Sequence, residues 1–161
     1  PRPTPGHPRA SSSEVTIHPM NAESLQHRKG GMPHSILICD DEPHVTQLMG
    51  LVLRDAGFTV RTASHGRMAF EMAAQDPPDL VVTDFQMPLM NGLELATKLR
   101  EHEATAEVPV IMLTSRSHRL DDEEMAATRI VKLLPKPFSP REVTQEVVRV
   151  LETASPSTEA A

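Results

Sequence analysis

The stretch Asp79-Leu80-Val81-Val82-Thr83-Asp84-Phe85-Gln86-Met87-Pro88 decides the fold, because an apolar run ends abruptly on a carboxylate and a turn. Residues 80–83 are too few and too β-branched for a helix, and such a run is typical of a strand covered on both faces. Ligands of open parallel sheets bind outside the carboxyl ends of the strands. Asp84 is therefore a candidate reaction centre, although an Asp that merely starts a surface turn is the commoner outcome for one strand end taken alone.

Four further short apolar runs alternate with segments of helical periodicity. We expect strands at residues 35–39, 58–62, 80–83, 108–113 and 130–134, and helices after Pro43, around 69–73, around 93–99, over 118–128 and from Pro140. Ser139 and Glu142 have the spacing of a capping box for the last helix. The alternation predicts the α/β class, a (βα)5 doubly wound parallel five-stranded sheet with right-handed crossovers and helices on both faces.

The two ends of the chain differ from its centre in composition. Residues 1–34 hold six of the fifteen prolines and little periodic apolar pattern, so we expect a disordered N-terminal tail, or a tag or linker. The chain begins with Pro1, which is expected of a fragment, a processed chain or a tagged one, and Met32 could mark the true start. The expected domain covers residues 35–153, and residues 154–161 form a C-terminal tail.

Charge and composition narrow the class of partner. Residues 1–35 carry four basic and two acidic side chains, and the remainder carries twelve basic and twenty acidic ones. An acidic domain without Trp or Tyr does not suit direct nucleic-acid binding. Cys39 is the only cysteine and lies in an apolar run, so we expect it to be buried. The absence of a long apolar stretch predicts no membrane contact and a cytoplasmic location.

Acidic, hydroxyl and amine groups follow four of the five expected strands. Asp40 and Asp41 follow the first strand, Asp84 ends the third, Thr114 follows the fourth and Lys136 follows the fifth. If the strand order is 2-1-3-4-5, these groups converge at one edge of the sheet. Carboxylates that lie close together repel one another unless a cation is present, and oxygen-only ligation suits Mg²⁺. None of the eight histidines has the spacing of a metal site.

The motifs at these strand ends resemble those of a known family. In order along the chain they are Asp40-Asp41, Asp84 with Met87-Pro88 and Asn91-Gly92, Thr114, and Lys136-Pro137-Phe138. Together they are similar to the receiver domain of two-component response regulators over about residues 35–153. The resemblance implies a flavodoxin-like, CheY-like fold with the strand order 2-1-3-4-5.

The resemblance also implies a role for each site residue. Asp84 would accept a phosphoryl group from a phosphohistidine donor. Asp41, Asp84 and the backbone carbonyl of Gln86 would bind Mg²⁺, or Mn²⁺ in its place, and Asp40 would act largely through a metal-bound water. Lys136 would pair with Asp84 and later with the phosphoryl group, and its bond to Pro137 would be cis, as in the family.

Thr114 and Leu133 are the residues that the resemblance implies for switching. Thr114 would hydrogen-bond the phosphoryl group and draw its loop inward. Leu133 stands where the family has an aromatic residue that swings with it, so the switch is expected to be weaker or to use other contacts. Asn91, Arg129 and Pro135 also depart from the family pattern.

The expected function is that of a phosphorylatable signalling switch without an output domain in this chain. It would catalyse only its own phosphorylation and dephosphorylation, so it would not be an enzyme in the usual sense. Its partners would be a sensor histidine kinase or histidine phosphotransfer protein and a downstream effector. It would be a monomer, or a weak dimer through the face made by the fourth helix, fifth strand and fifth helix.

Three alternatives remain open at this stage. The chain could be a pseudo-receiver that binds its partner constitutively, or the receiver segment of a larger hybrid histidine kinase. The third alternative is a phosphatase that passes through an aspartyl phosphate. It would need a general acid two residues after Asp84, and Gln86, which stands there, is not one.

Overall fold

The computed structural model describes residues 31–115 and 120–154. Its strands are β1 (Ser35–Cys39), β2 (Thr59–Ala63), β3 (Leu80–Asp84), β4 (Val110–Thr114) and β5 (Ile130–Pro135). Its helices are α2 (Pro43–Asp55), α3 (Gly66–Gln75), α4 (Gly92–Glu101), α5 (Asp122–Thr128) and α6 (Pro140–Ala154), with a 3-10 turn η1 (Glu103–Thr105). This order confirms the predicted (βα)5 alternation.

The strand and helix boundaries differ from the predicted ones by a few residues. β4 begins at Val110 instead of residue 108, because Pro109 has no N–H to donate to a neighbouring strand. α5 begins at Asp122 with Asp121 as its N-cap, whereas the sequence pattern placed a helix over 118–128. Most of the two predicted tails, at residues 1–34 and 154–161, lies outside the described residues, because residues 1–30 and 155–161 are not described.

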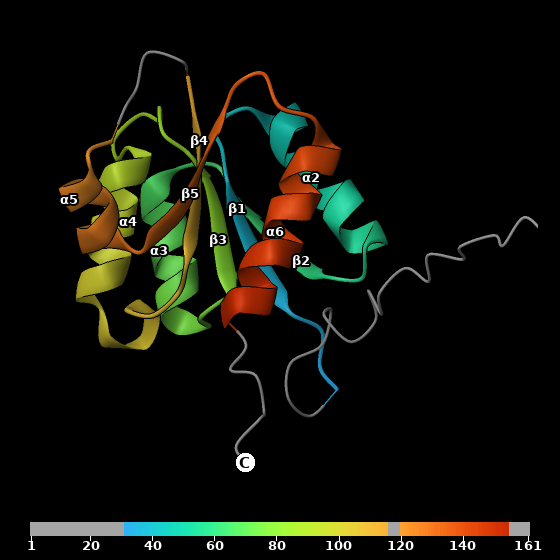
Figure 1. The fold of residues 1–161 in the computed structure, drawn as a ribbon, viewed down its shortest axis with the longest axis horizontal. Helices are drawn as coiled ribbons and strands as arrows, with labels where there is room; N and C mark the ends of the chain where they lie inside the picture. The colour runs from blue at the N-terminus through green and yellow to red at the C-terminus, as the bar shows by residue number, and fades with distance from the viewer. Residues whose placement is uncertain (1–30, 116–119, 155–161) are drawn as a thin grey trace, which may run out of the picture.

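The five strands form one parallel sheet in the order β2-β1-β3-β4-β5, which confirms the expected order. In Figure 1, α2 and α6 cover one face of this sheet, and α3, α4 and α5 cover the other. The strand residues alternate between the two faces as the pleat requires. Ile36 and Ile38 pack under α2 and α6, whereas Leu37 and Cys39 pack under α3 and α4. Cys39 is fully buried, as predicted.

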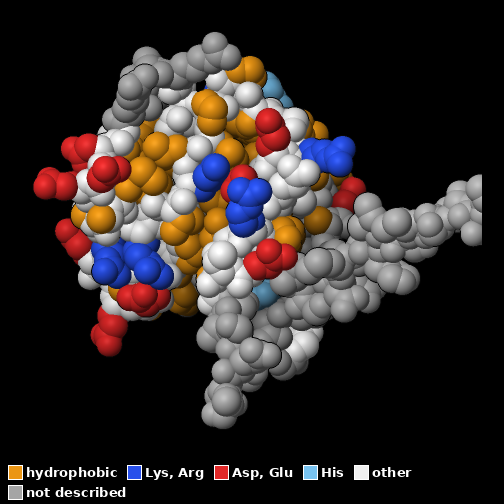
Figure 2. Space-filling view, in the orientation of Figure 1, with side chains coloured by type: hydrophobic (Ala, Val, Ile, Leu, Met, Phe, Trp, Pro, Cys, Tyr) orange, Lys and Arg blue, Asp and Glu red, His pale blue; other side chains and the backbone are white. Residues whose placement is uncertain are grey.

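Reciprocal capping boxes mark where two of the helices begin. At α6, the Ser139 N–H donates to Glu142 Oε2 (2.6 Å) and the Glu142 N–H donates to Ser139 Oγ (3.2 Å), which confirms the predicted capping box. Asp121 and Glu124 form the same reciprocal pair at α5. Two of the four acidic residues at 121–124 therefore serve as caps, and acidic side chains gather at the edge where α5 lies (Figure 2).

None of the helices in the described parts of the chain has the length and apolar character needed to cross a membrane.

Candidate metal centre

Three carboxylates meet at the carboxyl ends of β1 and β3. These strands are parallel neighbours, and Cys39 lies opposite Thr83, so the residues that follow each strand come out side by side. One carboxylate oxygen from each of Asp40, Asp41 and Asp84 lies within 4.8 Å of the others. The predicted convergence is therefore present, and no histidine belongs to this group of possible metal ligands.

Burial makes the charge of this cluster costly. Asp40 is 1% exposed and Asp84 is 5% exposed, whereas Asp41 is exposed. Burial, followed by the charge of Asp84, raises the pKa of Asp40 from its ordinary 3.8 to about 6. Burial also raises the pKa of Asp84. Asp40 Oδ1 accepts a hydrogen bond from the Glu42 N–H (2.9 Å), but the buried Oδ2 accepts none from the described residues.

Lys136 supplies the positive charge nearest to these carboxylates in the described structure. Its Nζ lies 3.1 Å from Asp84 Oδ1 and 4.0 Å from Asp40 Oδ2. Its backbone N–H donates to the Thr114 carbonyl (2.7 Å), and the following peptide bond, to Pro137, is cis as expected. Burial opposes the charged amine, but the hydrogen bond to Asp84 and the negative charges of Asp84, Asp40 and Glu42 together outweigh it, so the pKa of Lys136 is raised.

One ammonium group does not balance three carboxylates, and Asp40 Oδ2 accepts no hydrogen bond from the described residues. A small divalent cation bound by oxygen atoms would meet both needs, and Mg²⁺ is the cation that such open, carboxylate-based sites suit. Asp41 and Gln86 line the same shallow hollow of about 420 Å³, beside Asn91 and Pro88. The loop that carries Gln86 is therefore on the correct side of the cluster to supply a further ligand.

The two residues expected to act as a switch lie on β4 and β5. Thr114 ends β4, is 4% exposed, and makes no side-chain hydrogen bond to another described residue. Asp84 pairs with Leu113 in the sheet, so Thr114 lies one residue further along the neighbouring strand. Leu133 is half-buried on β5, in register with Met112, and packs on the face covered by α4 and α5.

Two glycines support the site in a way that the sequence reasoning missed. A Cβ on Gly92 would lie 2.5 Å from the Asp84 carbonyl oxygen and 2.6 Å from Met112 Sδ. A Cβ on Gly66 would lie 2.9 Å from the Met90 carbonyl oxygen, in the loop that follows Asp84. Glycine is unfavourable in a helix, so its presence at the first residue of both α3 and α4 was an available signal of close backbone approach.

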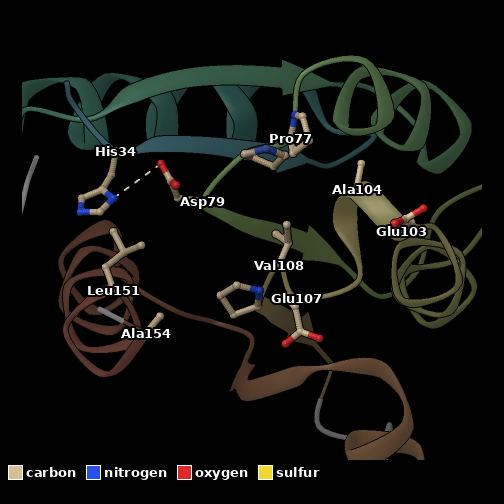
Figure 3. Close-up of a pocket in the computed structure, with 11 residues that line it drawn as sticks. His34, Pro77, Asp79, Glu103, Ala104, Glu107, Val108, Leu151 and Ala154 are labelled. Carbon is tan, nitrogen blue, oxygen red and sulfur yellow. Dashed lines mark ion pairs between the residues drawn. The ribbon is translucent and has the colours of Figure 1, made fainter. Parts of the chain in front are cut away.

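A larger cavity, of about 520 Å³, lies at the opposite edge of the sheet. Figure 3 shows His34 and Asp79 on one side of it and Glu103 and Glu107 on the other. None of the clustered carboxylates lines it, whereas a cavity of about 560 Å³ beside the cluster is lined by Glu42, Lys136 and Phe138.

Known proteins resemble this chain in sequence and in fold. A family model described as the response regulator receiver domain matches residues 36–148. The transcriptional regulatory protein SrrA of Staphylococcus aureus is 35% identical over 127 residues, which cover 79% of this chain and 52% of that protein. The chain thus spans about half the length of the curated relatives it matches.

Solved structures resemble the fold over most of their length. The chemotaxis protein CheY4 of Vibrio cholerae is 31% identical with a TM-score of 0.67, and the match covers 73% of this chain and 98% of that one. The signal receiver domain of a signal transduction histidine kinase from Syntrophus aciditrophicus is 25% identical with a TM-score of 0.63, and covers 80% of this chain and 96% of that one.

Proposed function

Because this chain belongs to the response regulator receiver domain family of two-component systems, we propose that it accepts a phosphoryl group on Asp84 from a phosphohistidine donor in a Mg²⁺-dependent reaction. The receiver would extend over residues 35–153, between tails at 1–34 and 154–161. The observation that carries the proposal is the contact of Lys136 Nζ with Asp84 Oδ1 (3.1 Å) beside two further carboxylates.

The chemistry follows from the surroundings of Asp84. A carboxylate oxygen of Asp84 forms a bond to phosphorus while the bond between phosphorus and the donor nitrogen breaks, and the imidazole leaves with that electron pair. Aspartyl phosphates are a known class of covalent intermediate. Catalysis of such a transfer is mainly positioning and stabilisation of charge, which the buried carboxylate and its paired amine are placed to provide.

The residues of the cluster divide into ligands and charge partners. Asp41, Asp84 and the Gln86 carbonyl would hold Mg²⁺, or Mn²⁺ in its place, and Asp40 would act through a bound water. The cation, when bound, neutralises charge on the transferring group. Lys136 would move from Asp84 to a phosphoryl oxygen after the transfer.

Thr114 and Leu133 would transmit a conformational change from the phosphorylated site to the surface of the domain. The Thr114 hydroxyl would donate to the phosphoryl group and draw the loop after β4 inward, and Leu133 would repack with it. The altered surface would be that of α5, β5 and α6, which would bind a downstream effector or a second copy of the chain weakly. The donor would be a sensor histidine kinase or a histidine phosphotransfer protein, in the cytoplasm.

The similarity to a receiver domain taken from a histidine kinase supports a second arrangement. In that case the chain would be the receiver segment of a hybrid kinase, with residues 1–34 as its linker. The chemistry at Asp84 would be the same, so the mass of the full-length native protein distinguishes the two arrangements.

The test is direct phosphorylation of the purified full chain. With Mg²⁺ and acetyl phosphate, intact mass spectrometry should show the gain of one phosphoryl group. Asp84→Asn should gain none, while Asp55→Asn, which changes an exposed carboxylate at the end of α2, should behave as the parent. A phosphoryl gain by Asp84→Asn would remove the assignment. A parent that gains nothing, and that beryllofluoride does not perturb, would favour a constitutive pseudo-receiver.

A further inference from the structure

The cavity of about 520 Å³ lies at the amino ends of the strands, far along the sheet from Asp84. The chain enters β1 and leaves α6 at this same end of the molecule (Figure 1). His34, three residues after the first described residue, lines the cavity, and so does Ala154, the last residue of α6. The segments before residue 31 and after residue 154 therefore both begin beside it.

The polar lining of the cavity is acidic. Asp79, Glu103 and Glu107 contribute carboxylates, and His34 is the only basic type of side chain among the described residues of the lining (Figure 3). Glu107 already pairs with Arg100 and Arg129, both at 3.2 Å. Asp79 Oδ2 accepts from the Ser35 N–H at 2.7 Å and lies 3.5 Å from His34 Nδ1. Glu103 makes no ion pair with any residue in the described parts of the chain.

The remainder of the described lining is apolar, and the buried His34 Nδ1 is directed at Asp79 (Figure 3). Pro77, Val108 and Leu151 supply apolar surface, as Figure 3 shows. His34 is 8% exposed, and its Nδ1 is buried without a hydrogen bond from the described residues. An apolar floor with a carboxylate at the rim fits a cationic group on an aliphatic stem, which is the shape of a Lys or Arg side chain.

The chain carries such side chains within reach, in only one of the two adjoining segments. Residues 155–161 hold a single charged side chain, Glu159, which the acidic rim would repel. Arg28 and Lys29 lie just before Gly30-Gly31, with no acidic residue between them and the cavity. Lys29 is five residues from His34, a span of at most about 17 Å. Gly31 has φ +79°, a conformation in which the backbone can reverse its direction cheaply.

We propose that the Arg28-Lys29 segment docks across this cavity, with one of its two basic side chains on Glu103 and the stem of the other against Leu151. The short tether gives an effective concentration in the millimolar range or above. Exposed ion pairs are individually weak and are screened by salt, so the contact is modest and reversible. Docking would link the entry to β1 with the last turn of α6, where the chain leaves the domain.

The experiment uses the full chain labelled with ¹⁵N and ¹³C. Nuclear Overhauser contacts should join the Arg28 or Lys29 side chain to the Leu151 methyl groups. The double variant R28E/K29E should lose these contacts and shift the amides of Glu103, Ala104, Leu151 and Ala154. The matched control is R2E/R9E, which makes the same charge change further from the cavity and should leave those amides unshifted.

Charge exchange identifies the anchor. Glu103→Lys should produce the same loss of contacts. Its combination with R28E/K29E should restore contacts between the side chains at positions 28 and 29 and the Leu151 methyl groups. Contacts that are absent from the parent chain, or amide shifts that are equal in R28E/K29E and R2E/R9E, would overturn the proposal. If the Leu151 methyl groups instead show contacts to residues 155–161, the C-terminal segment occupies the cavity and the proposal is wrong. The outcome is independent of phosphorylation, since the Asp84→Asn chain should show the same contacts.

Discussion

At the scale of single residues, Asp40 shows how burial sets the chemistry of the cluster. The folded protein binds a proton on Asp40 more tightly than the unfolded chain does, because its pKa rises from 3.8 to about 6. The free energy of unfolding of the metal-free protein should therefore fall as the pH rises from about 4 to about 6. Above that range the ionised carboxylate lowers stability by a constant amount.

Asp40→Asn should remove this cost. An amide keeps the acceptor for the Glu42 N–H and carries no charge. Urea unfolding in EDTA at pH 7.5 should show a gain of about 1–3 kcal/mol, and the gain should shrink as the pH approaches 4. Asp55→Asn is the control and should change little. A variant that is no more stable than the parent at pH 7.5 would contradict the proposed origin of the pKa shift.

Lys136 is the second residue whose role can be isolated. Lys136→Met removes the amine that lies 3.1 Å from Asp84 Oδ1 while keeping most of the side-chain volume. Mg²⁺ should still bind, because the three carboxylates remain, but phosphorylation by acetyl phosphate should slow by about 100-fold or more. Time-resolved intact mass spectrometry and calorimetry measure the two effects separately. Lys132→Met, which removes a half-exposed amine of β5 that pairs with Glu146 of α6, should leave the rate unchanged.

At the scale of secondary-structure elements, the start of α4 determines the position of the Asp84 backbone. The Gly92 N–H donates to the Phe85 carbonyl (2.8 Å), and Asn91 Oδ1 accepts from the Glu94 N–H (2.8 Å). The helix therefore begins directly against the end of β3. This contact requires a residue without a side chain, because the nearest atom is a backbone oxygen that cannot move independently.

Gly92→Ala should accordingly destabilise the protein by about 1–3 kcal/mol, since the added methyl group overpacks the site. Gly50→Ala is the matched control, because its Cβ would meet only the end of the Arg54 side chain, at 3.2 Å. In the middle of α2 that substitution should instead stabilise by about 0.5–1 kcal/mol. Denaturant unfolding of the two variants tests both signs. If Gly92→Ala were as stable as the parent, the close approach to Asp84 would be wrong.

At the scale of the whole molecule, metal binding and folding should be linked. Mg²⁺ needs carboxylates from two strands, so it should bind the folded chain only and stabilise it by about 2.7 kcal/mol at a hundredfold excess over Kd. Asp41→Asn should abolish this gain without lowering the metal-free stability, because Asp41 is exposed and its charge repels those of Asp40 and Asp84. The gain should also weaken as the pH falls through about 6, where Asp40 takes up a proton. Thermal scans with Mg²⁺ or EDTA provide the measurement.

The stability gained with Mg²⁺ supports the site only if the Asp41→Asn variant does not gain it too. If Asp41→Asn were stabilised by Mg²⁺ as much as the parent, the ion would be acting elsewhere on an acidic protein. A chain whose melting temperature did not respond to Mg²⁺ at all would contradict the metal centre itself.

The sequence by itself determined which segments are strands and helices and which chemical groups follow each strand. Runs such as Leu80–Thr83 and the spacing of Val143, Val147 and Val150 are local patterns, and local patterns reflect the periods of the backbone. The burial of Cys39 and the cap at Ser139 followed from the same kind of evidence. The strand order came from the family resemblance, since no local pattern specifies which strands become neighbours.

Only the tertiary structure decided what those groups do to one another. The 3.1 Å contact between Lys136 and Asp84, the raised pKa of Asp40 and the lack of room at Gly92 join residues from elements that are distant in the sequence. Each depends on how closely helices and strands pack, and a carboxylate changes its pKa only when packing removes water from it. Periodicity contains no such distances, so the charge balance of the cluster could not be obtained before the chain was folded.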